Sequence, residues 1–292
     1  MFDQCSRVVK EGVVLMVERI KLGMKLLDAL MPDGFPRNVF VVIKGEPGTG
    51  KTTMMTELAF RTLERGEPVV MVVFGQTPLS LIQRFLSMEW DITEHIERKK
   101  IVFIDGFSTR VAHEWIVEKM HGRVKEIYKK FREVMRVLKT PGDPSELYSV
   151  IYSSVENMGM IGQGAVIIDS LTELMVTMSQ TSLLDFIRRI RSTIVKELWV
   201  PVFASVMPGL SREFDLLLDC IVDGVIDVRF NPVVLQKGGL IREARIRKMP
   251  AKVLPIWVPF TVDKGIGALP VRETLERLKE GIERALKESL LA

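Results

Sequence analysis

One eight-residue segment combines glycines, a lysine and a threonine at the spacing that binds phosphate. Residues 45–52 read Gly-Glu-Pro-Gly-Thr-Gly-Lys-Thr, which satisfies G-x-x-x-x-G-K-[ST] at every fixed position. Glycines in this pattern let the backbone curl, so that its N–H groups point at phosphate oxygens. Lys51 would face the β- and γ-phosphates, and the Thr52 hydroxyl would bind Mg²⁺. We therefore expect a nucleoside triphosphate, ATP with Mg²⁺, on a site made of Gly45, Glu46, Pro47, Gly48, Thr49, Gly50, Lys51, Thr52 and Thr53.

Magnesium beside such a loop requires an acidic partner, and two aspartates are candidates. Asp105 follows the apolar run Ile101–Ile104, and Asp169 follows Ala165–Ile168. Both would lie at the carboxyl end of a buried strand, where ligands of open α/β sheets bind. Spacing leaves the choice open, and the aspartate that does not bind metal would cap a turn.

Short apolar runs alternate with segments of helical period through most of the chain. This alternation indicates βαβ units and a mostly parallel sheet buried on both faces, so the expected fold class is α/β. Helices are expected at Lys51–Arg65, with Gly66 at the C-cap, and at Leu79–Glu89. Strands are expected at Val39–Ile43, Val69–Phe74, Ile101–Ile104, Ala165–Ile168, Val200–Ser205, Cys220–Phe230 and Arg242–Lys248. The loop would join the first strand to the first of these helices.

Two segments fall outside this alternation. Residues 113–158 are longer than one crossover helix requires, and apolar residues from Val124 to Leu138 recur there at helical spacing between basic ones. Residues 271–290 carry a second helical apolar stripe. We expect one domain over residues 1–292, with a helical insert at about 113–158 and a C-terminal helix at about 271–290.

Composition excludes several classes of protein. The 41 basic and 37 acidic residues leave a small net charge of +4, which does not by itself indicate nucleic acid. Two cysteines cannot form a disulfide framework, and the three histidines show no zinc spacing. No apolar run approaches the roughly 20 residues of a membrane span, and no secretory leader is visible. We expect a cytoplasmic protein with no membrane segment.

With these residues placed, the chain resembles the KaiC-like ATPases of the RecA superfamily over most of its length. Ile168-Asp169-Ser170-Leu171-Thr172 resembles their Walker B segment, which favours Asp169 over Asp105 as the metal ligand. Further similar segments are Glu18–Gly23, Leu27-Asp28, Gly34–Arg37, Asp223–Ile226, Arg242, Arg245-Ile246, Lys248-Met249 and Gly265-Ile266. The resemblance implies a RecA-like core, with ATP between neighbouring subunits of a hexameric ring or a filament.

The chain departs from this family at two catalytic positions. Where the family places a glutamate pair that polarises the attacking water, this chain has Gly75 and Gln76. Gln76 could orient a water but cannot act as a base. The family's Lys-Met-Arg-Gly reads Lys248-Met249-Pro250-Ala251, so Lys248 alone is left to reach a neighbour's nucleotide. Glu173 is the best substitute carboxylate, although a surface position on a helix is the favoured interpretation.

These residues predict an ATP-binding regulator or assembly scaffold, forming homo-oligomers with an unknown protein partner, with weak or absent hydrolysis. An active ATPase is the first alternative, and a recombinase-related DNA-binding protein is the second. Basic residues at 123–139 and 188–191 could contact nucleic acid, but without interleaved aromatic residues a solvated helix is the favoured interpretation.

Overall fold

The computed structural model describes residues 5–10, 13–108, 122–209, 211–253, 256–265 and 267–271. Its strands are β1 (Cys5–Lys10), β2 (Val13–Ile20), β3 (Phe35–Pro36), β4 (Phe40–Gly45), β5 (Val69–Val73), β6 (Ile101–Asp105), β7 (Met135–Val137), β8 (Ala165–Asp169), β9 (Val202–Val206), β10 (Gly224–Phe230), β11 (Arg242–Lys248), β12 (Val258–Asp263) and β13 (Gly267–Pro270). Its helices are α1 (Lys25–Leu30), α2 (Lys51–Glu64), α3 (Pro78–Ser87), α4 (Thr93–Glu97), α6 (Gly122–Glu133), α7 (Pro144–Asn157), α8 (Leu171–Thr177), α9 (Gln180–Ile190) with a π-helical continuation (Arg191–Glu197), α10 (Arg212–Ile221) and α11 (Pro232–Gln236).

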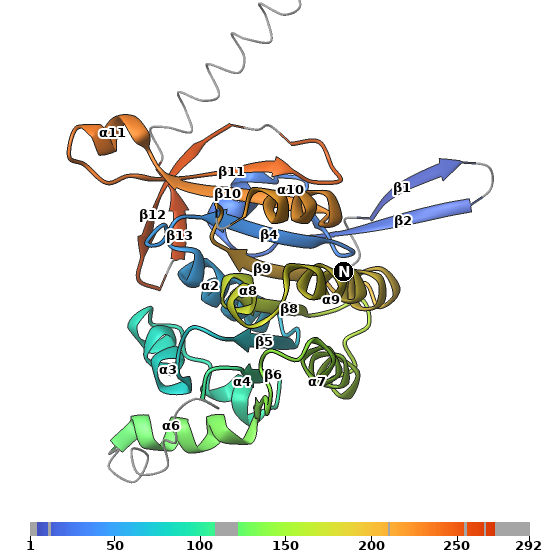
Figure 1. Cartoon of the computed structure of the whole chain (residues 1–292), viewed down its shortest axis with the longest axis vertical. Helices are drawn as coiled ribbons and strands as arrows, with labels where there is room; N and C mark the ends of the chain where they lie inside the picture. Colours follow the sequence, from blue (N-terminus) through green and yellow to red (C-terminus); the bar gives the residue numbers. More distant parts are fainter. Residues whose placement is uncertain are drawn as a thin grey trace, which may run out of the picture.

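A ten-stranded sheet runs through these residues in the order β13-β12-β11-β10-β4-β9-β8-β5-β6-β7 (Figure 1). Neighbouring strands from β10 to β7 are parallel, whereas β11, β12 and β13 extend the sheet as antiparallel strands. Strands β1, β2 and β3 form a separate antiparallel sheet, and the β1–β2 hairpin extends away from the large sheet. The predicted α/β class with a mostly parallel sheet is confirmed.

Side chains alternate along each central strand between two apolar layers. In β4, Val41 and Ile43 belong to one layer, while Phe40 and Val42 belong to the other. Helices α1, α2, α3, α4 and α6 cover the first layer, and α7, α8, α9 and α10 cover the second. Because both faces are covered, the strands appear in sequence as continuous apolar runs.

The expected junction between the first strand and helix is present, with β4 leading through residues 46–50 into α2. Helix α2 ends as predicted at Gly66, which has φ 78°. Gly66 N donates to Leu63 O at 2.8 Å, and Glu67 N donates to Thr62 O at 3.2 Å. These two bonds form a Schellman motif, which satisfies carbonyls at the helix end.

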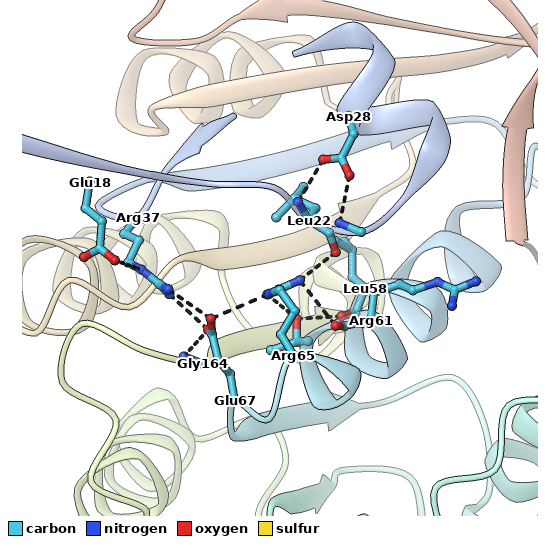
Figure 2. Close-up of polar contacts among 11 residues, drawn as sticks. Glu18, Leu22, Asp28, Arg37, Leu58, Arg61, Arg65, Glu67 and Gly164 are labelled. Carbon is cyan, nitrogen blue, oxygen red and sulfur yellow. Dashed lines mark hydrogen bonds and ion pairs between the residues drawn. The ribbon is translucent and has the colours of Figure 1, made fainter. Parts of the chain in front are cut away.

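A partly buried ionic network fixes the C-terminal end of α2 to its neighbours (Figure 2). Both carboxylate oxygens of Glu67 accept hydrogen bonds from Arg37, at 2.9 and 3.0 Å, and one also accepts from Gly164 N at 2.8 Å. Arg37 also donates to Glu18 on β2, and Arg65 donates to Leu22 O. Burial alone would raise the pKa of Glu67, but its bonds with Arg37 outweigh burial and lower it. The network joins β2, the start of β4, α2 and the start of β8.

The segment at 113–158 differs from the expected run of helix. Helix α6 ends at Glu133, and Met135–Val137 forms the edge strand β7 beside β6. The apolar stripe divides there, since Phe131 and Val134 pack in the first layer and Leu138 packs in the second. Strand β10 also begins at Gly224, later than Cys220, which belongs to α10.

The helix expected at 271–290 lies outside the described residues, apart from Val271, which is not helical. Among the helices that are described, none has the length and apolarity needed to cross a bilayer.

Candidate nucleotide-binding site

Three glycines shape the loop for different physical reasons. Gly48 and Gly50 adopt φ of 82° and 98°, which L-residues with a side chain rarely reach. Gly45 has no such φ, but a Cβ there would lie 2.5 Å from Val228 O and 2.8 Å from Thr49 Oγ1. The loop therefore has no room for a side chain at its first position and needs left-handed backbone at two others.

Lys51 lies inside the curve of the loop. Its Nζ donates to Gly45 O at 2.7 Å and to Glu46 O at 2.9 Å. Burial lowers the pKa of Lys51, while the charges of Asp169 and Glu46 oppose that shift. The ammonium group is therefore held at the start of α2, where the helix N-terminus also favours an anion.

A cavity of about 230 Å³ opens beside the loop. It is lined by Thr52, Gly75, Gln76, Arg84, Asp169, Ser170 and Glu173. Because β8 and β5 are adjacent strands, their carboxyl ends bring the residues that end β8 and those that follow β5 to one place. The structure thus brings together Thr52, Gln76 and Asp169, which are far apart in sequence.

Asp169 is 7% exposed and accepts a hydrogen bond from the Ser205 hydroxyl on β9. Burial raises its pKa, and bonds from Ser205 and Thr52 oppose that rise. A carboxylate and a hydroxyl facing each other suit Mg²⁺, which takes few protein ligands and completes its shell with phosphate oxygens and water. The described residues contain no group of three or more His, Cys, Asp or Glu able to hold a metal.

The other candidate, Asp105, does not line this cavity. It is fully buried, and its Oδ1 accepts from Phe107 N at 2.8 Å and Ser108 N at 2.9 Å. Asp105 therefore caps the turn after β6, the role expected of the aspartate that does not face the loop.

Two charged side chains in the cavity carry chemistry that the sequence did not clearly indicate. Arg84, on α3, donates from Nε to Gln76 Oε1 at 3.5 Å. Glu173 lies in the first turn of α8, beside Gly75. A Cβ built on Gly75 would be 3.9 Å from Glu173 Oε1. The sequence singled out Glu173 only by its distance from Asp169, and nothing in the pattern of α3 selected Arg84.

Lys248 does not join the cavity of its own chain. Its Nζ donates to Asp219 O at 2.6 Å and Val222 O at 2.7 Å, which caps the C-terminal end of α10. In the sheet Lys248 is the register partner of Val225, which is in turn the partner of Val42 in the middle of β4. Lys248 therefore lies away from the end of β4 that leads into the loop. Action of Lys248 across a subunit boundary stays a prediction.

Comparisons with known proteins agree over most of the chain. A family model described as "ATPase: KaiC" matches residues 20–256. The UPF0273 protein of Methanopyrus kandleri is 31% identical over 160 residues, which cover 55% of this chain and 56% of that protein. The chain thus aligns with just over half the length of the first curated relatives it matches.

Two further relatives align over nearly the whole chain. The UPF0273 protein of Saccharolobus solfataricus is 22% identical over 291 residues, 93% of this chain and 96% of that one. The crystal structure of a KaiC-like protein from Pyrococcus horikoshii superposes with a TM-score of 0.66 at 22% identity, covering 87% of this chain and 99% of that one. This similarity shows a shared fold.

Proposed function

Since the chain belongs to the KaiC ATPase family, we propose that it binds ATP with Mg²⁺ and acts as a nucleotide-dependent regulator or assembly scaffold with slow or absent hydrolysis. One observation carries this proposal: a complete phosphate loop lies beside a cavity that holds Thr52 and Asp169 together. In this arrangement the loop amides and Lys51 would bind the β- and γ-phosphates, and Thr52 and Asp169 would hold Mg²⁺. The metal, when bound, would neutralise phosphate charge.

Slow turnover follows from what surrounds the loop. Neither Gly75 nor Gln76 supplies a carboxylate, and the amide of Gln76 cannot take a proton from water. Pro250 stands where the family often has an arginine that reaches the neighbour's nucleotide. Such an arginine is worth about 10³-fold or more in related phosphoryl transfers, so binding should survive better than hydrolysis.

A second candidate function is active ATP hydrolysis. The observation that favours it is the carboxylate of Glu173, which lines the same cavity as Thr52 and Asp169. There it could orient and deprotonate a water in place of the missing glutamate pair. The two candidates share the nucleotide site and differ in rate.

Assembly into a hexamer is a part of the proposal that rests on family resemblance. Binding to an unknown protein partner and a location in the cytoplasm complete the proposal. Nucleic-acid binding is disfavoured by how the arginines at 188–191 are used. Arg188 pairs with Asp185 and Arg191 with Asp223, while the Arg189 guanidinium lies 3.7 Å from the centre of the Tyr148 ring. Such arginines would have to leave partners in their own chain before they contact a phosphate backbone.

The test is calorimetric titration of the full chain with ATP and Mg²⁺, followed by a phosphate-release assay. Wild type should bind, and Lys51→Ala should abolish the heat because it removes the charge inside the loop. Lys130→Ala removes an exposed lysine outside the loop and should bind like wild type. No binding by wild type would overturn the proposal, whereas rapid hydrolysis that Lys51→Ala abolishes would establish the second candidate.

A further inference from the structure

A groove of about 460 Å³ lies between α7 and the β6–β7 edge of the large sheet. None of the described residues lines both this groove and the nucleotide cavity. Helix α7 packs against β5 and β6, and β7 is the edge strand beyond β6 (Figure 1). One wall of the groove is a single face of α7, because its residues recur three and four positions apart. That wall consists of Glu146, Val150, Ser153, Ser154, Asn157 and Met158.

The floor of the groove is apolar. Val102 of β6 belongs to the second layer and is 8% exposed, and Val150 and Met158 are half-buried against the same layer. None of the described residues that line the groove is aromatic, so these residues offer no ring on which a nucleic-acid base could stack. The floor therefore suits an aliphatic side chain.

Three basic side chains lie at the two ends of the groove. Helix α7 leads into β8, so its C-terminal end lies near the amino ends of the parallel strands, where Lys99 precedes β6. Arg136 and Lys139 lie at the other end, where Glu146 accepts hydrogen bonds from Lys139 N at 2.8 Å and Thr140 N at 2.7 Å. Within the part of the chain that the structure describes, none of the three cations has a carboxylate partner. Both ends can therefore receive an anion.

We propose that this groove binds an extended acidic segment of a partner protein, with an apolar side chain between acidic ends. The inference rests on the proposed function and gives a chemistry to its protein partner. From Glu146 to the C-cap residue Met158, α7 is about 18 Å long. An extended chain covers that length in about five residues. Cations at both ends and an apolar floor between them are complementary to such a segment.

The edge strand itself is protected against pairing with another strand. Val134 O and Leu138 N bond to β6, so the backbone groups of Met135 point away from β6. Arg136 Nη1 donates to Met135 O at 2.9 Å and so occupies that outward carbonyl. A short, basic edge strand with a covered carbonyl resists the addition of a strand. The partner segment is therefore expected to lie in the groove and to be recognised through side chains.

The experiment selects peptides on the full chain from a random heptapeptide library displayed on phage. Enriched sequences should carry acidic residues on both sides of an apolar one. The most enriched peptide, labelled with fluorescein, is then titrated with protein and followed by anisotropy. The double variant Lys99→Glu/Lys139→Glu should weaken binding of this peptide at least about 5-fold, because it removes two attractions and adds two repulsions.

Two controls separate charge in the groove from net charge and from folding. Lys25→Glu/Lys252→Glu changes the net charge equally, at two exposed lysines outside the groove, and should bind the peptide like wild type. The same peptide with its acidic residues replaced by the corresponding amides should bind wild type at least about 5-fold more weakly. The groove variant should bind ATP with Mg²⁺ like wild type, which also reports that it is folded.

The outcomes distinguish this inference from the function on which it rests. Selection that enriches no peptide, or only peptides without acidic residues, would overturn the inference, as would equal weakening by the two double variants. A labelled oligothymidylate that loses affinity only in the groove variant would assign the groove to nucleic acid and overturn it as well. Each of these results leaves ATP binding intact. Failure of wild type to bind ATP would instead overturn the proposed function while the selected peptide still binds.

Discussion

Replacing Glu173 with glutamine tests whether the remaining turnover depends on a carboxylate from α8. The substitution keeps the size of the side chain and removes its ability to accept a proton. Among the residues that line the cavity, only Asp169 and Glu173 carry carboxylates, and Asp169 is already bonded to Ser205. Of the described residues that line the cavity, Glu173 is therefore the side chain that we expect to activate water.

The expected loss can be bounded from the geometry. A positioned general base contributes about 10²- to 10⁴-fold to rate. Glu173 is only half-buried, so we expect the lower end, about 10²-fold in kcat, which corresponds to about 2.7 kcal/mol of transition-state stabilisation. Affinity for ATP should change little, because the carboxylate lies in the cavity and outside the loop.

The assay is single-turnover phosphate release with excess protein, which detects slow hydrolysis without product release. Glu213→Gln is the matched control, since Glu213 is an exposed glutamate in the first turn of α10 and both substitutions remove the same favourable charge near a helix N-terminus. A Glu173→Gln rate within 2-fold of both wild type and Glu213→Gln would refute the assignment and leave Gln76 or a neighbouring subunit as the group that orients water.

Further predictions concern the metal, pH and the partly buried network. Asp169→Asn should leave ATP binding measurable but remove its enhancement by Mg²⁺; titrations with and without Mg²⁺ check this, and an undiminished enhancement would contradict it. Burial raises the pKa of Glu57 from 4.5 to about 7, so the folded chain holds a proton that the unfolded chain releases, and stability should fall as pH rises from about 4.5 to about 7. Glu57→Gln should flatten the dependence of the melting temperature on pH between pH 5 and 8, because an amide does not titrate, and it keeps an acceptor for Ala268 N. An unchanged slope would show that another group titrates. Arg37→Met should cost about 3 kcal/mol and lower the melting temperature by about 6–12 °C, because it leaves Glu67 buried without its main partner. Arg98→Met, which breaks an exposed pair with Glu94, should cost under about 1 kcal/mol, and equal losses in the two variants would show that the Arg37 network adds nothing.

Sequence predicted the parts of this fold that depend on local pattern. The loop, the strand that precedes it, the helix that follows it and the glycine that ends α2 are each encoded within a few consecutive residues. Strand β7 was missed because it is three residues long, lies at the sheet edge and is partly exposed, so its residues continue the stripe of α6. The choice between Asp105 and Asp169 needed the family resemblance, since both follow equally apolar strands.

The missed site residues depend on contacts between distant segments. Arg84 reaches the cavity because of the orientation of α3. In the sequence, an arginine near the end of an amphipathic helix is typical of a solvated position, so the pattern did not indicate this contact. Sequence therefore indicated which ligand to expect and left open which side chains surround it.

The end of the sheet gives the reason why Glu173 would be able to replace a residue that follows another strand. Val73 and Asp169, the last residues of β5 and β8, are register partners, so Gly75 and the first turn of α8 leave the sheet side by side. A Cβ built on Gly75 would lie 3.9 Å from the Glu173 Oε1, an ordinary contact distance, so a longer side chain at position 75 would start beside that carboxylate. Glutamates at both positions would place two negative charges together, which raises the energy of the doubly ionised site. The two positions are thus alternatives, and Gly75→Glu should restore hydrolysis more strongly beside Glu173→Gln than in wild type, a coupling that additive effects would disprove.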